Sequence, residues 1–131
     1  VAISMVAVKA ARVGHEKTQY GPGLESVRPA LRDSKYDDYA LITKSRASAP
    51  YGRQTQLRIN SQYTLVITPE SRERDGGIRA DIRVEIAPKK PGDRPVNVIS
   101  AKGVLAPGKP LRLGGPKVDN GDLIVILIAT Q

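Results

Sequence analysis

The chain has 131 residues, no Cys, Phe or Trp, and a formal net charge of +8. Its length predicts one domain that buries roughly two thirds of the surface exposed by the unfolded chain. The absence of Cys excludes disulfide frameworks, thiolate zinc sites, Cys nucleophiles and acylated Cys anchors. We therefore expect residues 1–131 to form a single domain with an aliphatic core.

The first third of the chain predicts two strands separated by a loop and a short helix. Val1–Val13 is rich in Val, Ile and Ala on both faces of a strand, so it could lie inside its own sheets or be exchanged with a neighbour. Gly14–Gly23 is a predicted loop. Residues 24–33 have apolar residues at helical spacing, and Pro29 predicts that this helix is short or kinked. Tyr36–Thr43 predicts the next strand.

The remaining apolar segments are short and separated by turn residues. The expected strands are Gln54–Asn60 and Tyr63–Thr68, which form a hairpin, then Ile78–Ala87, Val96–Val104 and Leu111–Leu113, before a turn at Gly114–Pro116. The last strand contains the unbroken apolar run Leu123–Ala129, which indicates that both of its faces are covered. This pattern predicts an all-β fold, an antiparallel two-sheet β-sandwich of about eight strands with one short helix near residues 24–33.

Four patterns that could carry chemistry each lack a required feature. Gly103–Lys109 matches the start of a phosphate-binding loop, but Pro110 has neither the hydroxyl nor the backbone N–H needed next, so a turn is expected. His15 has no serine motif around it, and Asp119–Asp122 lacks alternate oxygen ligands, as in a tight turn. Asp37–Asp38 would point to opposite faces of a strand. We predict a non-enzymatic protein without catalytic residues, metal or cofactor, and expect no small-molecule substrate.

The positive charge lies in two zones. One zone, from Tyr39 to Pro69, has no acid, and the other, from Ala87 to Val118, has a single one. They could attract an anionic polymer such as nucleic acid or acidic polysaccharide, or they could be a solvated surface. The candidate polyanion-binding residues are Arg53, Arg58, Lys89, Lys90, Arg94, Lys102, Lys109 and Arg112. Only the first zone is flanked by rings, those of Tyr51 and Tyr63, on which bases could stack.

The order of motifs resembles a group of uncharacterised bacterial exported β-sandwich domains. The resemblance lies in Val6–Ala10, in Tyr36-x-x-Tyr39-x-Leu41, in Tyr63–Pro69, and in the closely spaced Leu and Gly residues of 111–124. It implies an envelope or surface module with no known activity and no catalytic residues. The start at Val1 agrees with an excised secretory signal, so we expect an exported protein, periplasmic, cell-surface or extracellular.

These observations predict a structural or assembly module of the bacterial envelope or an extracellular polymer. It would act on other copies of itself, as an oligomer or filament, through strand pairing and apolar contacts. The expected assembly contacts are Val1, Ile3, Met5, Val6, Val8, Ile124, Ile126 and Ile128. The same residues could instead fill the subunit's own core. Basic polyanion binding is the alternative function, and the apolar run is too short to span a membrane, which needs about 20 residues.

Overall fold

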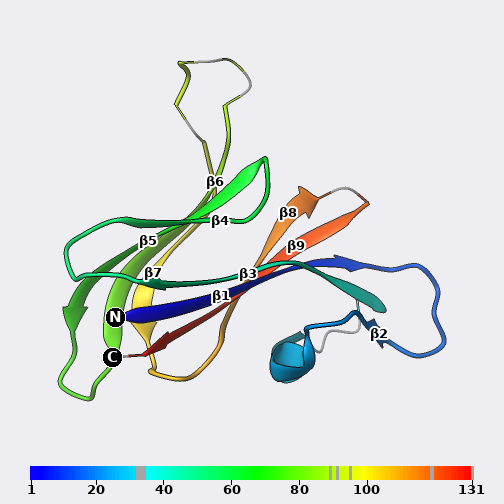
Figure 1. Ribbon diagram of the computed structural model, residues 1–131, viewed down its shortest axis with the longest axis horizontal. Coiled ribbons are helices and arrows are strands. Elements are labelled where there is room, and N and C mark those ends of the chain that lie inside the picture. Colours follow the sequence, from blue (N-terminus) through cyan, green and yellow to red (C-terminus); the bar gives the residue numbers. More distant parts are fainter. Residues whose placement is uncertain (32–34, 89, 91, 95, 119, 131) are drawn as a thin grey trace.

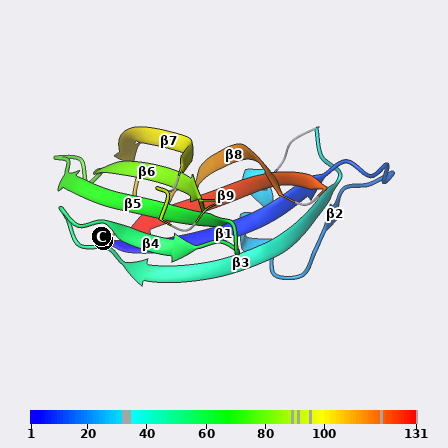
Figure 2. The ribbon, with the colours of Figure 1, turned by 90° about the horizontal axis from the view of Figure 1, so that it is seen from above.

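A computed structural model of the chain describes residues 1–31, 35–88, 90, 92–94, 96–118 and 120–130. The elements are β1 (Ala2–Ala11), β2 (Gln19–Tyr20), the 3-10 helix η1 (Glu25–Leu31), β3 (Asp38–Ser48), β4 (Thr55–Arg58), β5 (Tyr63–Arg72), β6 (Ile78–Ile86), β7 (Val96–Leu105), β8 (Leu111–Val118) and β9 (Gly121–Thr130). Sheet A has the strand order β2-β3-β1-β9-β8, and sheet B has the order β4-β5-β6-β7. The two sheets pack as layers (Figures 1 and 2), which confirms the predicted all-β sandwich with one short helix.

The strand pairing differs from the prediction at two places. The predicted Gly14–Gly23 loop contains β2, which pairs in parallel with β3, whereas the other pairs are antiparallel. The predicted turn at Gly114–Pro116 is wrong, because β8 continues to Val118 through an irregularity between Gly114 and Lys117. An edge strand can accommodate Gly and Pro at such a bulge without turning back.

The main core lies between the two sheets. Strand β6 shows the predicted alternation most clearly, since Ile78, Ala80, Ile82 and Val84 are buried. They pack in one cluster with alternate residues of β1 and β9, which are Ile3, Met5, Ala7, Leu123, Val125, Leu127 and Ala129. The β4–β5 hairpin is confirmed, and it adds its own inward side chains to this cluster.

A second core covers the opposite face of sheet A. Leu24, just before η1, and Val27 and Leu31 within it share this cluster with the outward residues of β1 and β9, which are Val8, Ala10, Ile124 and Ile126. Each large apolar side chain buried in this way stabilises the fold by about 1.5–3 kcal/mol. Strands β1 and β9 are therefore apolar on both faces because sheet B covers one face and η1 covers the other.

Helix η1 covers only part of the outer face of sheet A. It lies toward the end of β1 and the start of β9, while the two chain termini lie together at the far end of the sheet (Figure 1). Its helical geometry is 3-10, and Pro29 inside it lacks the backbone N–H that a longer α-helix would need. The outer face between η1 and the chain termini is thus left open.

Candidate functional site

The predicted assembly contacts lie mostly inside the chain's own fold. Strand β1 is in the interior of sheet A, paired with β3 on one side and β9 on the other. The buried contacts are Ile3, Met5, Val8, Ile124 and Ile126, and the partly exposed ones are Val1, Val6 and Ile128. Val1 packs partly against the core between the sheets. Val6 and Ile128 face outward on the open part of sheet A, where they line a groove.

Among the described strands, the sheet edges differ in how well they are protected against pairing with another chain. Strands β2 and β4 have only two and four residues, and β8 contains Pro116 and a bulge. Beyond β2, the edge of β3 carries the charged side chains of Lys44 and Arg46. Short length, Pro, bulges and charge all oppose edge-to-edge pairing. Strand β7, in contrast, is ten residues long, contains no Pro and pairs with β6 at nine positions, with one irregularity at Val98.

Strand β7 also exposes three apolar side chains. Val96, Val98 and Val104 are 60%, 39% and 48% exposed. Its one charged side chain, Lys102, has its ammonium nitrogen 4.0 Å from Asp81 on β6, which partly offsets that charge. A long, apolar edge with little charge is a template for strand addition.

The open part of sheet A forms a groove beside η1. Strand register brings Ser4 of β1 next to Arg46 of β3 and Ile128 of β9, and brings Val6 next to Lys44. The groove has two adjoining hollows of about 480 and 670 Å³, and Ser4, Arg46 and Ile128 line both. Ser26 and Val27 of η1 form one wall of the first hollow. We call this site the β1–η1 groove.

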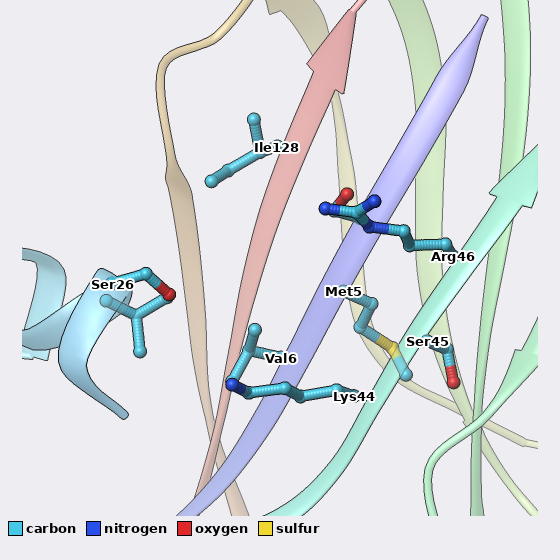
Figure 3. Close-up of a pocket in the computed structure, with 9 residues that line it drawn as sticks. Met5, Val6, Ser26, Lys44, Ser45, Arg46 and Ile128 are labelled. Atoms are coloured by element: carbon cyan, nitrogen blue, oxygen red, sulfur yellow. The ribbon is translucent and has the colours of Figure 1, made fainter. Parts of the chain in front are cut away.

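Two cationic side chains cross the β1–η1 groove. Lys44 and Arg46 start on β3 and extend over β1 toward η1; in Figure 3 Lys44 passes beside Val6, and Arg46 lies below Ile128. The hydroxyl of Ser26 lies on the opposite wall (Figure 3). No described carboxylate forms an ion pair with Lys44 or Arg46. The groove thus combines hydrogen-bond donors and positive charge with an apolar floor.

The nearest acid at this site is Glu25, at the start of η1. The pKa of Glu25 is lowered, first by a hydrogen bond from its own backbone N–H and then, more weakly, by Gly23 and the charges of Arg28 and Lys44. Lys44 therefore shares some of its field with Glu25. Arg46 is not among these partners, so it is the stronger candidate to receive an external anion.

The predicted polyanion-binding residues lie on several separate elements. Arg58 lies on edge strand β4, and Arg53 lies just before it. The Arg58 guanidinium donates a hydrogen bond to the carbonyl of Asn60. Lys102 lies on β7 and Arg112 on β8, which belong to different sheets but contact each other. Lys90 and Arg94 lie in the connection between β6 and β7, and Lys109 lies in the connection between β7 and β8. Lys89 lies outside the described residues.

Sequence reasoning missed Lys44 and Arg46 as a site because of an irregularity in β3. The register shifts between Ala7 and Val8 of β1, so Ile42 has no register partner there. With strict alternation, Lys44 and Arg46 would lie on the opposite face from Tyr39. The shift brings them to the outer face instead. The one available signal was the alternation of Lys44 and Arg46 with smaller polar residues.

The residues considered for chemistry have structural roles. His15 Nε2 lies 3.3 Å from Asp38 Oδ1 in an exposed contact. The buried Asp37 carboxylate accepts hydrogen bonds from the backbone N–H groups of Val13, Gly14 and His15. The first of these bonds is the largest cause that lowers the pKa of Asp37. This arrangement fixes the loop after β1, and it offers no nucleophile.

One of the other two candidate motifs forms a turn in the structure. The phosphate-loop-like sequence ends β7 and continues into a turn in which the N–H of Lys109 donates to the carbonyl of Ala106, as predicted. The calcium-like sequence includes Asp119, which lies outside the described residues. In the described part of the chain, no three His, Cys, Asp or Glu side chains are placed to hold a metal ion, and no helix is long and apolar enough to cross a bilayer.

Comparison of the chain with protein-family profiles, curated proteins and solved structures finds no match. Edge strand β7 and the β1–η1 groove are therefore the two surfaces that bear on the function of this protein.

Proposed function

We propose that this protein is a non-enzymatic structural or assembly module of the bacterial envelope or an extracellular polymer. Copies of the chain would associate through strand pairing and apolar contacts, after export. The observation that supports this proposal is the long edge of β7, which contains no Pro and exposes Val96, Val98 and Val104. Backbone N–H and C=O groups at such an edge are available for the pairing that joins two sheets.

Strand β7 supports pairing better than β1 does. Pairing through β1 would require this interior strand to leave β3 and β9, together with the core residues Ile3 and Met5. Pairing through β7 leaves the sandwich intact and adds a strand to sheet B. The energetic cost of reorganising the subunit is therefore much smaller at β7.

The proposal is tested by measuring the mass of the protein in solution by light scattering over a range of concentrations. Val98→Lys and Val104→Lys place a charge on β7, and Val13→Lys is the matched control, because Val13 is also highly exposed but lies in the loop after β1. Like charges brought together by β7 pairing should weaken association at least about tenfold. The control should associate like the parent protein.

Two results would overturn the proposal. One is a monomer up to the highest soluble concentration, and the other is association that Val98→Lys and Val104→Lys both leave unchanged. The alternative function, basic polyanion binding, would instead appear as association with an anionic polymer that falls steeply as salt is raised. It is less well supported, because the predicted bases are distributed over both sheets and several turns.

A further inference from the structure

We propose that the β1–η1 groove binds a long-chain carboxylate, a single-chain amphiphile with one anionic head group. This inference goes beyond assembly through β7 and is independent of it, since the groove lies on the outer face of sheet A and β7 is an edge of sheet B. The ligand would lie along β1, with its carboxylate at Arg46 and Lys44 and its chain over Val6 and Ile128.

The head-group end of the site is defined by the cations and a hydroxyl. Arg46 and Lys44 extend over the groove from β3, and Ser26 projects from η1 on the other side (Figure 3). A guanidinium can donate two parallel hydrogen bonds to one carboxylate, and these bonds are stronger than bonds between neutral groups. Because no described acid is ion-paired with Arg46, binding would not require an existing ion pair to break.

The rest of the groove favours an alkyl chain over a charged polymer. Val6, Val27 and Ile128 line it, and Val6 and Ile128 keep part of their surface accessible. An alkyl chain would remove this apolar surface from water, whereas a polyanion would gain nothing from it. The hollow beside η1, about 480 Å³, is in the range of small-ligand sites, about 300–1,000 Å³.

The experiment is calorimetric titration of the full chain with decanoate below its micelle concentration. Two probes separate the contributions of charge and chain: butyrate keeps the carboxylate with a short chain, and decyltrimethylammonium keeps the chain with a positive head. We expect decanoate to bind with one site per chain. The other two probes should bind at least about tenfold more weakly, since each lacks one half of the interaction.

Single substitutions test whether the ligand binds in the groove. Arg46→Gln and Ile128→Ser should each weaken decanoate binding at least about tenfold, through the head group and the chain respectively. Arg53→Gln is the matched control, because Arg53 is an exposed base in the turn after β3 and does not line the groove. Its affinity should equal that of the parent. Thermal unfolding of each variant establishes that the fold is retained.

Several outcomes would overturn the assignment. Equal binding of decyltrimethylammonium would show a non-specific apolar surface, and unchanged affinity in Arg46→Gln would place the head group elsewhere. If decanoate does not bind while the amide resonances of Val6 and Ile128 shift with protein concentration, the groove is a contact between copies. Tight binding of an anionic oligosaccharide in the absence of decanoate binding would identify a polymer site.

Discussion

The hydroxyl of Tyr36 donates a hydrogen bond of 2.6 Å to Asp122 Oδ2, although the two residues are 86 positions apart. The other carboxylate oxygen of Asp122 lies 2.7 Å from the ammonium nitrogen of Lys117. The segment that leads from η1 into β3 is thereby joined to the β8–β9 pair. This contact closes the end of the second core, because the ring of Tyr36 also packs edge-on against the buried Tyr39.

Removal of this hydroxyl should destabilise the fold. We expect Tyr36→Phe to lower the free energy of unfolding by about 1–2 kcal/mol, because Asp122 loses a hydrogen-bond donor while the ring stays in place. Urea denaturation measures the change. Tyr20→Phe is the control: the Tyr20 ring stacks on Tyr39 at a centroid distance of 5.2 Å, and that contact needs no hydroxyl. Equal losses in the two variants would contradict a specific role for the Tyr36–Asp122 bond.

Two carboxylates should make stability depend on pH in the acid range. Backbone hydrogen bonds, first from Val13, lower the pKa of Asp37, and the hydrogen bonds from Lys117 and Tyr36 lower that of Asp122. A carboxyl with a lowered pKa in the folded state stabilises the fold above the unfolded value of 3.8. That contribution is lost as the pH falls through the folded pKa. The free energy of unfolding should therefore decline as the solution is acidified below about pH 4.

Asp37→Asn isolates the first of these contributions. The neutral amide accepts the loop N–H groups less well, so the variant should be less stable at neutral pH and should lose less stability on acidification. Urea denaturation of parent and variant over a pH series from about 7 to about 2.5 gives both quantities. An unchanged slope below about pH 4 in the variant would show that Asp37 does not contribute to the pH dependence.

The cover provided by η1 can be tested with two valines on one face of β1. Val8 is fully buried under η1, and Val6, two residues earlier, lies in the open groove. Val8→Thr should lower the free energy of unfolding by about 1–3 kcal/mol, because its hydroxyl is placed in an apolar core. Val6→Thr should cost less than half as much, since water can reach the new hydroxyl. Equal costs, measured by urea denaturation, would contradict selective cover by η1.

The sequence was sufficient for the strands whose burial follows a strict period. Strand β6 alternates buried and more exposed residues from Ile78 to Val84, and the unbroken run in β9 correctly indicated cover on both faces. The origin of that cover was left open in the sequence, because helix η1 and a neighbouring subunit would impose the same pattern on β1 and β9. The position of η1 in the folded chain shows that this helix covers the outer face of β1 and β9.

The candidate groove could not be predicted, because two of its determinants are not local. The register shift opposite Ala7 and Val8 decides which face Lys44 and Arg46 occupy, and strict alternation in the sequence gives the wrong face. The partial length of η1 decides where the cover of sheet A stops. Likewise, the predicted turn at Gly114–Pro116 failed because turn residues also suit a bulge on an edge strand.

The close approach of β9 to β1 predicts different effects of Ala substitution at two glycines. A Cβ on Gly121 would lie 2.6 Å from the carbonyl oxygen of Ala10 and 2.9 Å from Lys9 Cγ, whereas a Cβ on Gly103 of β7 would have no neighbour within 4 Å. Gly121→Ala must therefore displace the backbone of β1, and we expect a loss of about 1–3 kcal/mol in the free energy of unfolding.

Gly103→Ala should instead leave stability unchanged or raise it by up to about 1 kcal/mol, because it restricts only the unfolded chain. Urea denaturation compares the two variants directly. Since β1 and β9 contribute residues to both cores, displacement at Gly121 should also speed hydrogen exchange of the amides of β1. Tolerance of Ala at both positions would mean that β1 and β9 can separate at this end without cost, contrary to their close contact.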